Sequence, residues 1–317
     1  PTPINTPGCR RWQGAWWNEP PLKSEPDTTM RWSDGRRSDN VDDRRGRPGP
    51  VVAAGGIGLG GLLLAVVVGL LGGDPRVVLQ QMSSGGAPMG GATASRPRPP
   101  TAAENQLADF VSVVLADTED TWEKEFRQVG RIYRPPTLVI FDGVVASACG
   151  QASGAMGPFY CPRDQKVYID LNFYRQLRQQ LGAPGDFAQA YVIAHEVGHH
   201  VQQQLGIEQK VTQMKQRLPE AQANQLSVRL ELQADCLAGV WAHNTAKQRR
   251  TLEEGDIEEA MNASARIGDD TLQRQSTGRV RPDSFTHGSA AQRQHWFATG
   301  LRSGDLNSCD TFSRRDV

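Results

Sequence analysis

The sequence predicts an α+β protein that is mainly helical, has a small β-sheet and is tethered to one transmembrane helix. Much of the second half repeats apolar residues at spacings of three and four, which is typical of amphipathic helices. Two short runs, 137–141 and 166–170, have the β-rich or alternating pattern of strands. A third run, 51–71, has no polar side chain and is long enough to cross a bilayer.

The chain ahead of the apolar run has two parts. Residues 1–29 show no periodicity, and we interpret them as an upstream extension that is disordered or artefactual. Residues 30–50 are polar and rich in arginine, and we expect them to be a cytoplasmic segment.

The run 51–71 is interpreted as a single transmembrane helix. At 1.5 Å per residue it would span about 31 Å, the thickness of a bilayer core. A buried core helix and a cleavable signal peptide are the alternatives. Five arginines lie between 36 and 47, whereas only Arg76 follows the run closely. This asymmetry predicts a cytoplasmic N-terminus and a C-terminal domain on the extracytoplasmic (periplasmic or extracellular) side of the cell membrane.

A tether and a globular domain follow. Residues 72–103 are rich in Gly, Pro and Ser and predict a flexible linker. The domain is expected over 104–317, and its first helix carries an apolar stripe that continues to Trp122 and Phe126 before Pro135 and Pro136 stop it. Further helices are expected at 219–246, 256–267 and 289–301.

Charge and cysteine content limit the partners and the compartment. The formal net charge is zero and the pI is about 7.4, so no nucleic-acid surface is indicated. The five cysteines are Cys9, Cys149, Cys161, Cys236 and Cys309. The last four can form two disulfides, which fits an oxidising compartment outside the cytoplasm.

The chemical centre of the sequence is the motif His195-Glu196-x-x-His199. An amphipathic helix is predicted around it, with Gly206 at its end. Residues four apart share one helix face, so the two imidazoles can bind one metal ion. Glu196 lies beside them and can take a proton from a water molecule that the metal activates. Two surface histidines with an incidental glutamate are the alternative.

A zinc hydrolase site needs a third protein ligand. On the predicted helix 219–246, Glu231 and Asp235 lie on a stripe of otherwise small residues, which would let that helix approach another closely. We assign Glu231 to the metal and Asp235 to a ligand imidazole, whose proton it would accept. An ordinary solvated acidic face is the alternative.

These motifs resemble those of the gluzincin metallopeptidases and, more narrowly, the neutral zinc metallopeptidase family of membrane-anchored bacterial proteins. The resemblance extends over nearly everything from Met30 onward and includes the stretches 30–32, 37–45, 157–162, 167–170, 231–236 and 284–288. It implies one zinc ion per chain, a helical domain with a small sheet, peptidase chemistry and a natural start at Met30. It also favours the pairings Cys149–Cys161 and Cys236–Cys309, and leaves Cys9 free.

The resulting prediction is a membrane-anchored zinc metallopeptidase that hydrolyses peptide bonds with water activated by the metal. Glu196 is the general base and then returns the proton to the leaving amine. A non-hydrolytic zinc-binding membrane scaffold and a zinc amidase acting on cell-wall peptides are the alternatives. Glu196 argues against the scaffold, because a structural site has no use for a carboxylate that is not a ligand. The expected partners are a peptide or protein substrate and membrane lipid.

Two further roles are predicted. The strand 166–170, through Val167, Tyr168 and Ile169, is expected to hold an extended substrate peptide, although a plain structural strand is the alternative. The resemblance extends to His287 with Arg293 six residues beyond it, and implies that His287 donates a hydrogen bond to the developing oxyanion. Arg293 would then anchor the loop. His200 and His243 are expected to have no chemical role.

Overall fold

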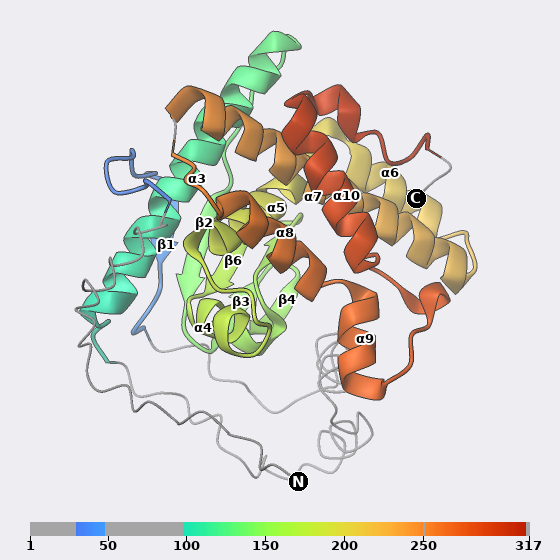
Figure 1. Cartoon of the computed structure of the whole chain (residues 1–317), viewed down its shortest axis with the longest axis horizontal. Coiled ribbons are helices and arrows are strands. Elements are labelled where there is room, and N and C mark those ends of the chain that lie inside the picture. Colours follow the sequence, from blue (N-terminus) through green and yellow to red (C-terminus); the bar gives the residue numbers. More distant parts are fainter. Residues whose placement is uncertain (1–29, 48–97, 250, 315–317) are drawn as a thin grey trace, which may run out of the picture.

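The computed structural model describes residues 30–47, 98–249 and 251–314, which form helices packed around a small sheet (Figure 1). The predicted extension 1–29, the predicted membrane helix 51–71 and nearly all of the predicted linker lie outside these residues. Within the described ranges, no helix is both long and apolar enough to cross a membrane.

The main sheet has four strands in the order β1-β2-β6-β5. Both predicted strands are confirmed as β2 (Thr137–Phe141) and β6 (Lys166–Asp170), which pair in parallel. At the two edges, β1 (Val41–Asp43) is parallel to β2 and β5 (Phe159–Cys161) is antiparallel to β6. A separate hairpin joins β3 (Val144–Ser147) to β4 (Gly150–Ser153), and a 3-10 turn, η1 (Gly154–Met156), follows.

Strand β1 corrects the predicted domain boundary. The segment 30–47 is part of the folded domain: Met30 is buried in the main core and Arg36 pairs with Glu119 at 2.8 Å. The segment 30–47 also contacts the start of the next described segment, since a Cβ added to Gly46 would lie 2.9 Å from the carbonyl oxygen of Arg98. The expected separation of segment 30–50 from the domain 104–317 therefore does not fit this fold.

Helix α3 (Ala102–Gln128) matches the predicted first helix of the domain. It begins two residues before the predicted start of the domain at 104. A capping box sets its start, because the Thr101 side chain accepts from the Glu104 N–H and the Glu104 carboxylate accepts from the Thr101 N–H. Its stripe, which includes Trp122 and Phe126, is buried against the core.

The remaining helices form most of the domain. They are α4 (Asn172–Gln179), α5 (Asp186–Leu205), α6 (Ile207–Lys215), α7 (Glu220–Arg249), α8 (Asp256–Arg266), α9 (Asp269–Thr277) and α10 (Ala290–Ser303), with the 3-10 turns η2 (Pro282–Ser284) and η3 (Leu306–Cys309). Gly206 ends α5 in the left-handed conformation, as predicted.

Helix α7 lies between α5 and α10, and small residues bring the three backbones together. A Cβ added to Gly198 of α5 would lie 3.1 Å from the carbonyl oxygen of Ala234 in α7. On the other face of α7, a Cβ on Gly300 of α10 would lie 1.9 Å from the carbonyl oxygen of Cys236. This close approach fixes the side chains of α7 relative to those of α5.

Both disulfides suggested by the resemblance are present in the structure. Cys149 joins Cys161 and closes the loop that contains the β3–β4 hairpin. Cys236 joins Cys309 and ties η3, close to the C-terminal end of the described chain, to α7. The second disulfide therefore braces the helix that carries Glu231.

Candidate metal centre

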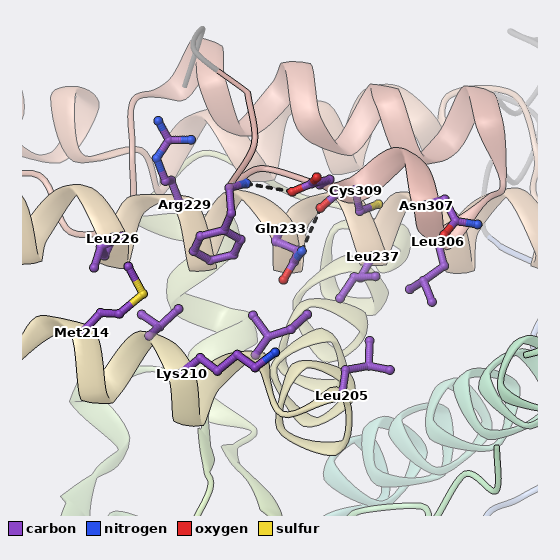
Figure 2. Close-up of a pocket in the computed structure, with 14 residues that line it drawn as sticks. Leu205, Lys210, Met214, Leu226, Arg229, Gln233, Leu237, Leu306, Asn307 and Cys309 are labelled. Carbon is purple, nitrogen blue, oxygen red and sulfur yellow. Dashed lines mark hydrogen bonds between the residues drawn. The ribbon is translucent and has the colours of Figure 1, made fainter.

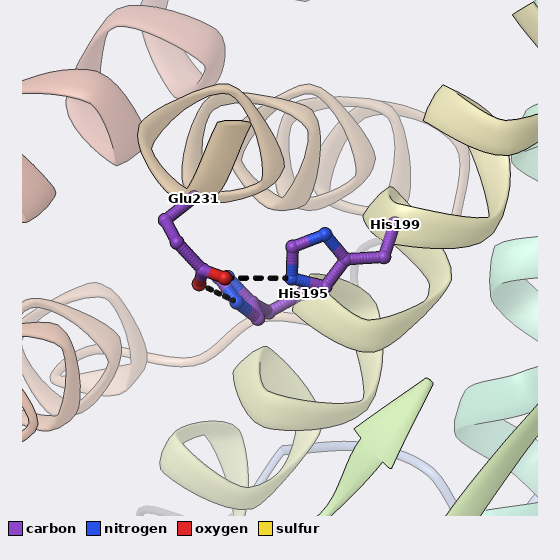
Figure 3. Close-up of side chains that lie close together, drawn as sticks. All are labelled: His195, His199 and Glu231. Atoms are coloured by element: carbon purple, nitrogen blue, oxygen red, sulfur yellow. Dashed lines mark hydrogen bonds and ion pairs between the residues drawn. The ribbon is translucent and has the colours of Figure 1, made fainter. Parts of the chain in front are cut away.

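Three side chains from two helices converge as the sequence predicted. His195 and His199 on α5 and Glu231 on α7 offer ligand atoms that lie within 4.8 Å of one another. Nε2 of His195 is 3.2 Å from Oε2 of Glu231, and Nε2 of His199 is 3.6 Å from its Oε1 (Figure 3). Burial opposes ionisation of Glu231, but His199 and His195 hold its pKa well below the usual range. The group therefore presents an ionised carboxylate between two imidazoles.

Asp235 orients His195 from one turn further along α7. Nδ1 of His195 donates to Oδ1 of Asp235 at 2.8 Å, which leaves Nε2 directed at the cluster. The Tyr191 hydroxyl donates to the same oxygen at 2.5 Å, and Arg293 binds both Asp235 oxygens at 2.9 Å. Burial raises the pKa of Asp235, but the Arg293 charge and His195 outweigh burial and lower it. Asp235 is thus an ionised partner for the imidazole.

The structure assigns Arg293 a different place from the one expected. It does not bind the His287 side chain; it lies 2% exposed against Asp235 and Tyr191. Its position ties α10 to the ligand-bearing helix α7. The tyrosine could have been suspected from the sequence, since it lies four residues before His195.

His199 has an equivalent partner that the sequence interpretation missed. Its Nδ1 donates to Oε1 of Gln202 at 2.9 Å. The Gln202 amide donates in turn to Gln233 at 3.1 Å, and Gln233 donates to the carbonyl of Cys309 at 2.8 Å. Gln202 is fully buried, so this chain of amides fixes the second imidazole as Asp235 fixes the first. The spacing of three from His199 was the available signal.

Glu196 lies apart from the ligand cluster. It follows His195 on α5 and is 9% exposed, but its carboxylate is not among the three groups that converge. A carboxylate next to a metal site but outside the ligand set is free to exchange protons.

His287 is held by an acidic residue that no local sequence pattern indicates. The backbone N–H groups of Thr286, His287 and Gly288 donate to Oδ2 of Asp269 at 2.7, 2.7 and 3.1 Å. Nδ1 of His287 lies 3.2 Å from Oδ1 of the same carboxylate, while its side chain stays half exposed. Burial lowers the pKa of His287, but Asp269 and Glu231 outweigh it and raise the pKa. His287 is therefore electrostatically coupled to the cluster.

Strand β6, which was expected to bind the substrate, lies inside the sheet and not at its edge. Val167, Tyr168 and Ile169 are each 1% exposed, and β6 is paired with β2 on one side and β5 on the other. Where both of its edges are paired, over residues 166–168, β6 has no free main-chain groups for a peptide. The edge strand on this side of the sheet is β5, and its Tyr160 hydroxyl lies 3.0 Å from Nδ1 of His200 on α5.

His200 and His243 each have a hydrogen-bond partner in the fold. His200 is fully buried, donates to the Arg134 carbonyl at 2.7 Å, and burial lowers its pKa to about 4. His243 lies 2.7 Å from the Leu301 carbonyl.

A separate groove of about 660 Å³ lies between α6, α7 and η3 (Figure 2). Its lining is mostly apolar, with Met214 and Leu226 among its walls, and includes Lys210 and Arg229. None of the three converging ligands lines it. Gln233 and Cys309, the last two members of the hydrogen-bonded chain behind His199, also line it.

A mainly helical fold with two imidazoles, a carboxylate and an adjacent free glutamate defines the zinc metallopeptidase class of sites. A family model described as "Putative neutral zinc metallopeptidase" matches residues 30–312, and the chain belongs to that family. The match begins at Met30.

Two relatives show how far the similarity extends. The "Uncharacterized protein YpfJ" of Escherichia coli K12 is 51% identical over 290 residues, which cover 90% of this chain and 99% of the relative. The "Uncharacterized protein Rv2575" of Mycobacterium tuberculosis H37Rv is 44% identical over 218 residues, which cover 66% of this chain and 73% of the relative. No solved structure matches the chain.

Proposed function

We propose that the protein is a zinc-dependent metallopeptidase that hydrolyses peptide bonds. The observation that carries this proposal is the convergence of His195, His199 and Glu231 beside Glu196. Two imidazoles and a carboxylate leave a coordination position for water, which is the pattern of catalytic and not of structural zinc sites.

The residues fit zinc in a second respect. Each imidazole has its Nδ1 bound, to Asp235 for His195 and to Gln202 for His199, so each presents Nε2 to the cluster. Partners of this kind fix the tautomer and raise the basicity of a ligand histidine. Burial lowers the pKa of His195, but Asp235 and Glu231 raise it to about 9 when no metal is bound. Zinc binding at neutral pH should therefore release a proton.

The reaction follows from the roles of the side chains. His195, His199 and Glu231 would hold the zinc ion, which would supply a polarised water molecule with a pKa lowered toward neutrality. Glu196 takes the water proton as the oxygen attacks the scissile carbonyl, and then delivers that proton to the leaving nitrogen. His287 donates a hydrogen bond to the oxyanion as it forms. The Asp269 carboxylate, which accepts from the His287 backbone N–H and lies next to its Nδ1, holds His287 in place.

An extended peptide would bind along β5. This strand forms the edge of the sheet next to α5, so its outer N–H and C=O groups can pair with a substrate backbone of any sequence. In this proposal β5 takes the role of binding the substrate backbone that the sequence predicted for β6. A proline at the outward N–H of β5 should raise KM and leave zinc in place.

Attachment to a membrane through residues 51–71 is also part of the proposal. Because β1 pairs with β2, the segment 30–47 and the catalytic domain would lie on one side of that membrane. The two disulfides favour the oxidising, extracytoplasmic side. Labelling of a single cysteine at Asp39 and of one at Glu254 in intact cells should give the same result. Labelling of only one of the two cysteines would show that segment 30–47 and the catalytic domain lie on opposite sides of the membrane.

Cleavage of a peptide library by the purified protein tests the activity. Cleavage that requires zinc and is abolished in Glu196→Gln would support the proposal. A Glu196→Gln protein as active as the parent would remove the assigned base. No cleavage of any peptide by zinc-loaded protein would favour the zinc-binding scaffold, and cleavage of cell-wall peptides alone would favour the amidase.

A further inference from the structure

A second group of three carboxylates lies where α5 begins, at the opposite end from Gly206. Asp186 is the first residue of α5, and Asp256 and Glu259 lie in the first turn or so of α8. One oxygen from each lies within 4.8 Å of the others. Gly185 is the N-cap residue of α5, and the Phe187 N–H donates to Glu259 at 3.1 Å.

The three carboxylates lack a matching positive charge among the described residues. Asp256 is 1% exposed; its Oδ2 accepts from the Glu253 N–H at 2.8 Å, but its Oδ1 accepts no hydrogen bond. Neither oxygen of Asp186 has a hydrogen bond of normal geometry, although both are shielded from solvent. Burial raises the pKa of Asp256 to about 6 and that of Glu259 to about 7, and the neighbouring carboxylates add to both shifts. Once these carboxyls ionise, their charges have no cationic partner among the described residues, and a cation would favour the ionised form.

The backbone N–H of Met30 is close to Asp186, one of the three carboxylates. The Met30 side chain is 3% exposed in the main core. Its N–H approaches Asp186 closely enough to oppose in part the effect of burial on that carboxyl's pKa. The next residue is held against the start of α8, because the Arg31 N–H donates to the Thr251 carbonyl at 2.8 Å and its side chain pairs with Glu253.

The family match begins at the same residue, Met30. The E. coli relative is covered over 99% of its length, while only 90% of this chain is covered. In a chain that begins at Met30, the nitrogen beside Asp186 is an α-ammonium group with a full positive charge and three donors.

We propose that Asp186, Asp256 and Glu259 form a binding site for the α-ammonium group of a chain that begins at Met30. A peptide nitrogen at the same place supplies one N–H and no charge, so it leaves the carboxylates unbalanced. The bound ammonium ties the N-terminus to the first residue of α5, and His195 lies further along the same helix. The site goes beyond the proposed peptidase activity and can be tested without measuring it.

The test compares two forms of a chain that runs from Met30 to Val317. One form has a free α-amino group; the other keeps the N-formyl group because peptide deformylase is inhibited during bacterial expression, and intact mass distinguishes them. The free form should melt roughly 5 °C or more above the formylated form at pH 7, since the formyl group removes the positive charge that faces a buried cluster of carboxylates. Zinc content should be equal in the two.

Side-chain variants locate the effect. Asp186→Asn should abolish the difference in Tm between the two forms, whereas Glu254→Gln, at an exposed carboxylate close to α8, should preserve it. Equal Tm values for the free and formylated parent chains would overturn the proposal. Stabilisation of both forms by Ca²⁺ or Mg²⁺, reversed by a chelator, would also overturn it and show a metal ion as the occupant.

Discussion

Helix α5 contributes to two clusters of side chains: Asp186 at its start belongs to one, and His195 and His199 belong to the other. The pKa values of the buried carboxyl groups shift in opposite directions in the two clusters. At His195, His199 and Glu231, the pKa of Glu231 lies well below its usual range. At Asp186, Asp256 and Glu259, the pKa values of all three carboxyls are raised. Burial acts in the same direction in both places, so the neighbours account for the difference.

The neighbours differ in a simple way. Glu231 faces two imidazoles, and Asp235 behind it faces Arg293, His195 and a tyrosine hydroxyl. The carboxylates at the start of α5 mainly face one another. The role of a buried acidic group therefore depends on its partners. The cluster with the two imidazoles can bind a divalent cation that replaces protons. The cluster of three carboxylates favours a cation, which the α-amino group of Met30 would supply in our proposal.

The largest effect is expected from Glu196→Gln, which removes the base and leaves the three ligands in place. Turnover should fall by about 10²- to 10⁴-fold. Zinc content should stay at the parental value, because Glu196 lies outside the ligand cluster. Steady-state kinetics and metal analysis on the same preparation check this, with Glu254→Gln as the control. Loss of zinc in Glu196→Gln would place this carboxylate among the ligands.

His287→Ala should lower kcat by about 100- to 1000-fold, since it removes one donor to the oxyanion. His295 on α10 is an exposed histidine close by in the sequence, and His295→Ala serves as the matched control. A kcat within threefold of the parent, with the fold intact, would leave His287 as a loop residue held by Asp269.

Asp235→Asn should reduce zinc affinity by roughly 10- to 100-fold, because the partner of His195 loses its charge. It should also lower Tm, since Arg293 is then a buried charge without a counter-ion. Adding Arg293→Gln should recover part of the Tm but none of the affinity. Competition with a chromogenic chelator measures the first effect and thermal melting the second. Unchanged affinity would show that Asp235 does not tune the ligand.

The smallest effect concerns pH at the start of α5. With Met30 blocked, burial and the neighbouring carboxylates raise the pKa of Asp256 to about 6 and that of Glu259 to about 7, above the ordinary carboxyl pKa values of 3.8 and 4.5. Between these limits the folded state binds more protons than the unfolded state, so stability should fall as pH rises through this window. A drop of a few °C in Tm from about pH 5 to 8 is expected.

In the chain with a free α-amino group at Met30, the ammonium favours the ionised carboxylates, so this fall in Tm should be smaller. Melting curves of both forms across the pH range measure it. Parallel pH profiles would show that the amino group does not reach the carboxylates.

Local spacing made the first cluster predictable. His195, Glu196 and His199 share one helix, and Glu231 and Asp235 lie one turn apart on another, so the 3.6-residue period orders each group before any packing is known. Gln202 follows the same rule and could have been added. The helix contacts through Gly198 and Ala234 then bring the two groups together.

Non-local pairing explains what could not be predicted. The alternation of Lys166–Asp170 identifies a strand but cannot say that β5 covers its edge. Residues 41–43 are too short and too polar to indicate β1, whose place depends on β2. Asp269 lies far from His287 in the sequence and meets it only through the fold.

Zinc titration of three proteins tests the central claim most directly. The parent chain should bind one zinc ion, Glu231→Gln should lose it, and Glu259→Gln should bind zinc as the parent does, because only the first cluster contains imidazoles. Retention of zinc with unchanged affinity in Glu231→Gln, or its loss in Glu259→Gln, would contradict the assignment of His195, His199 and Glu231 as the metal centre.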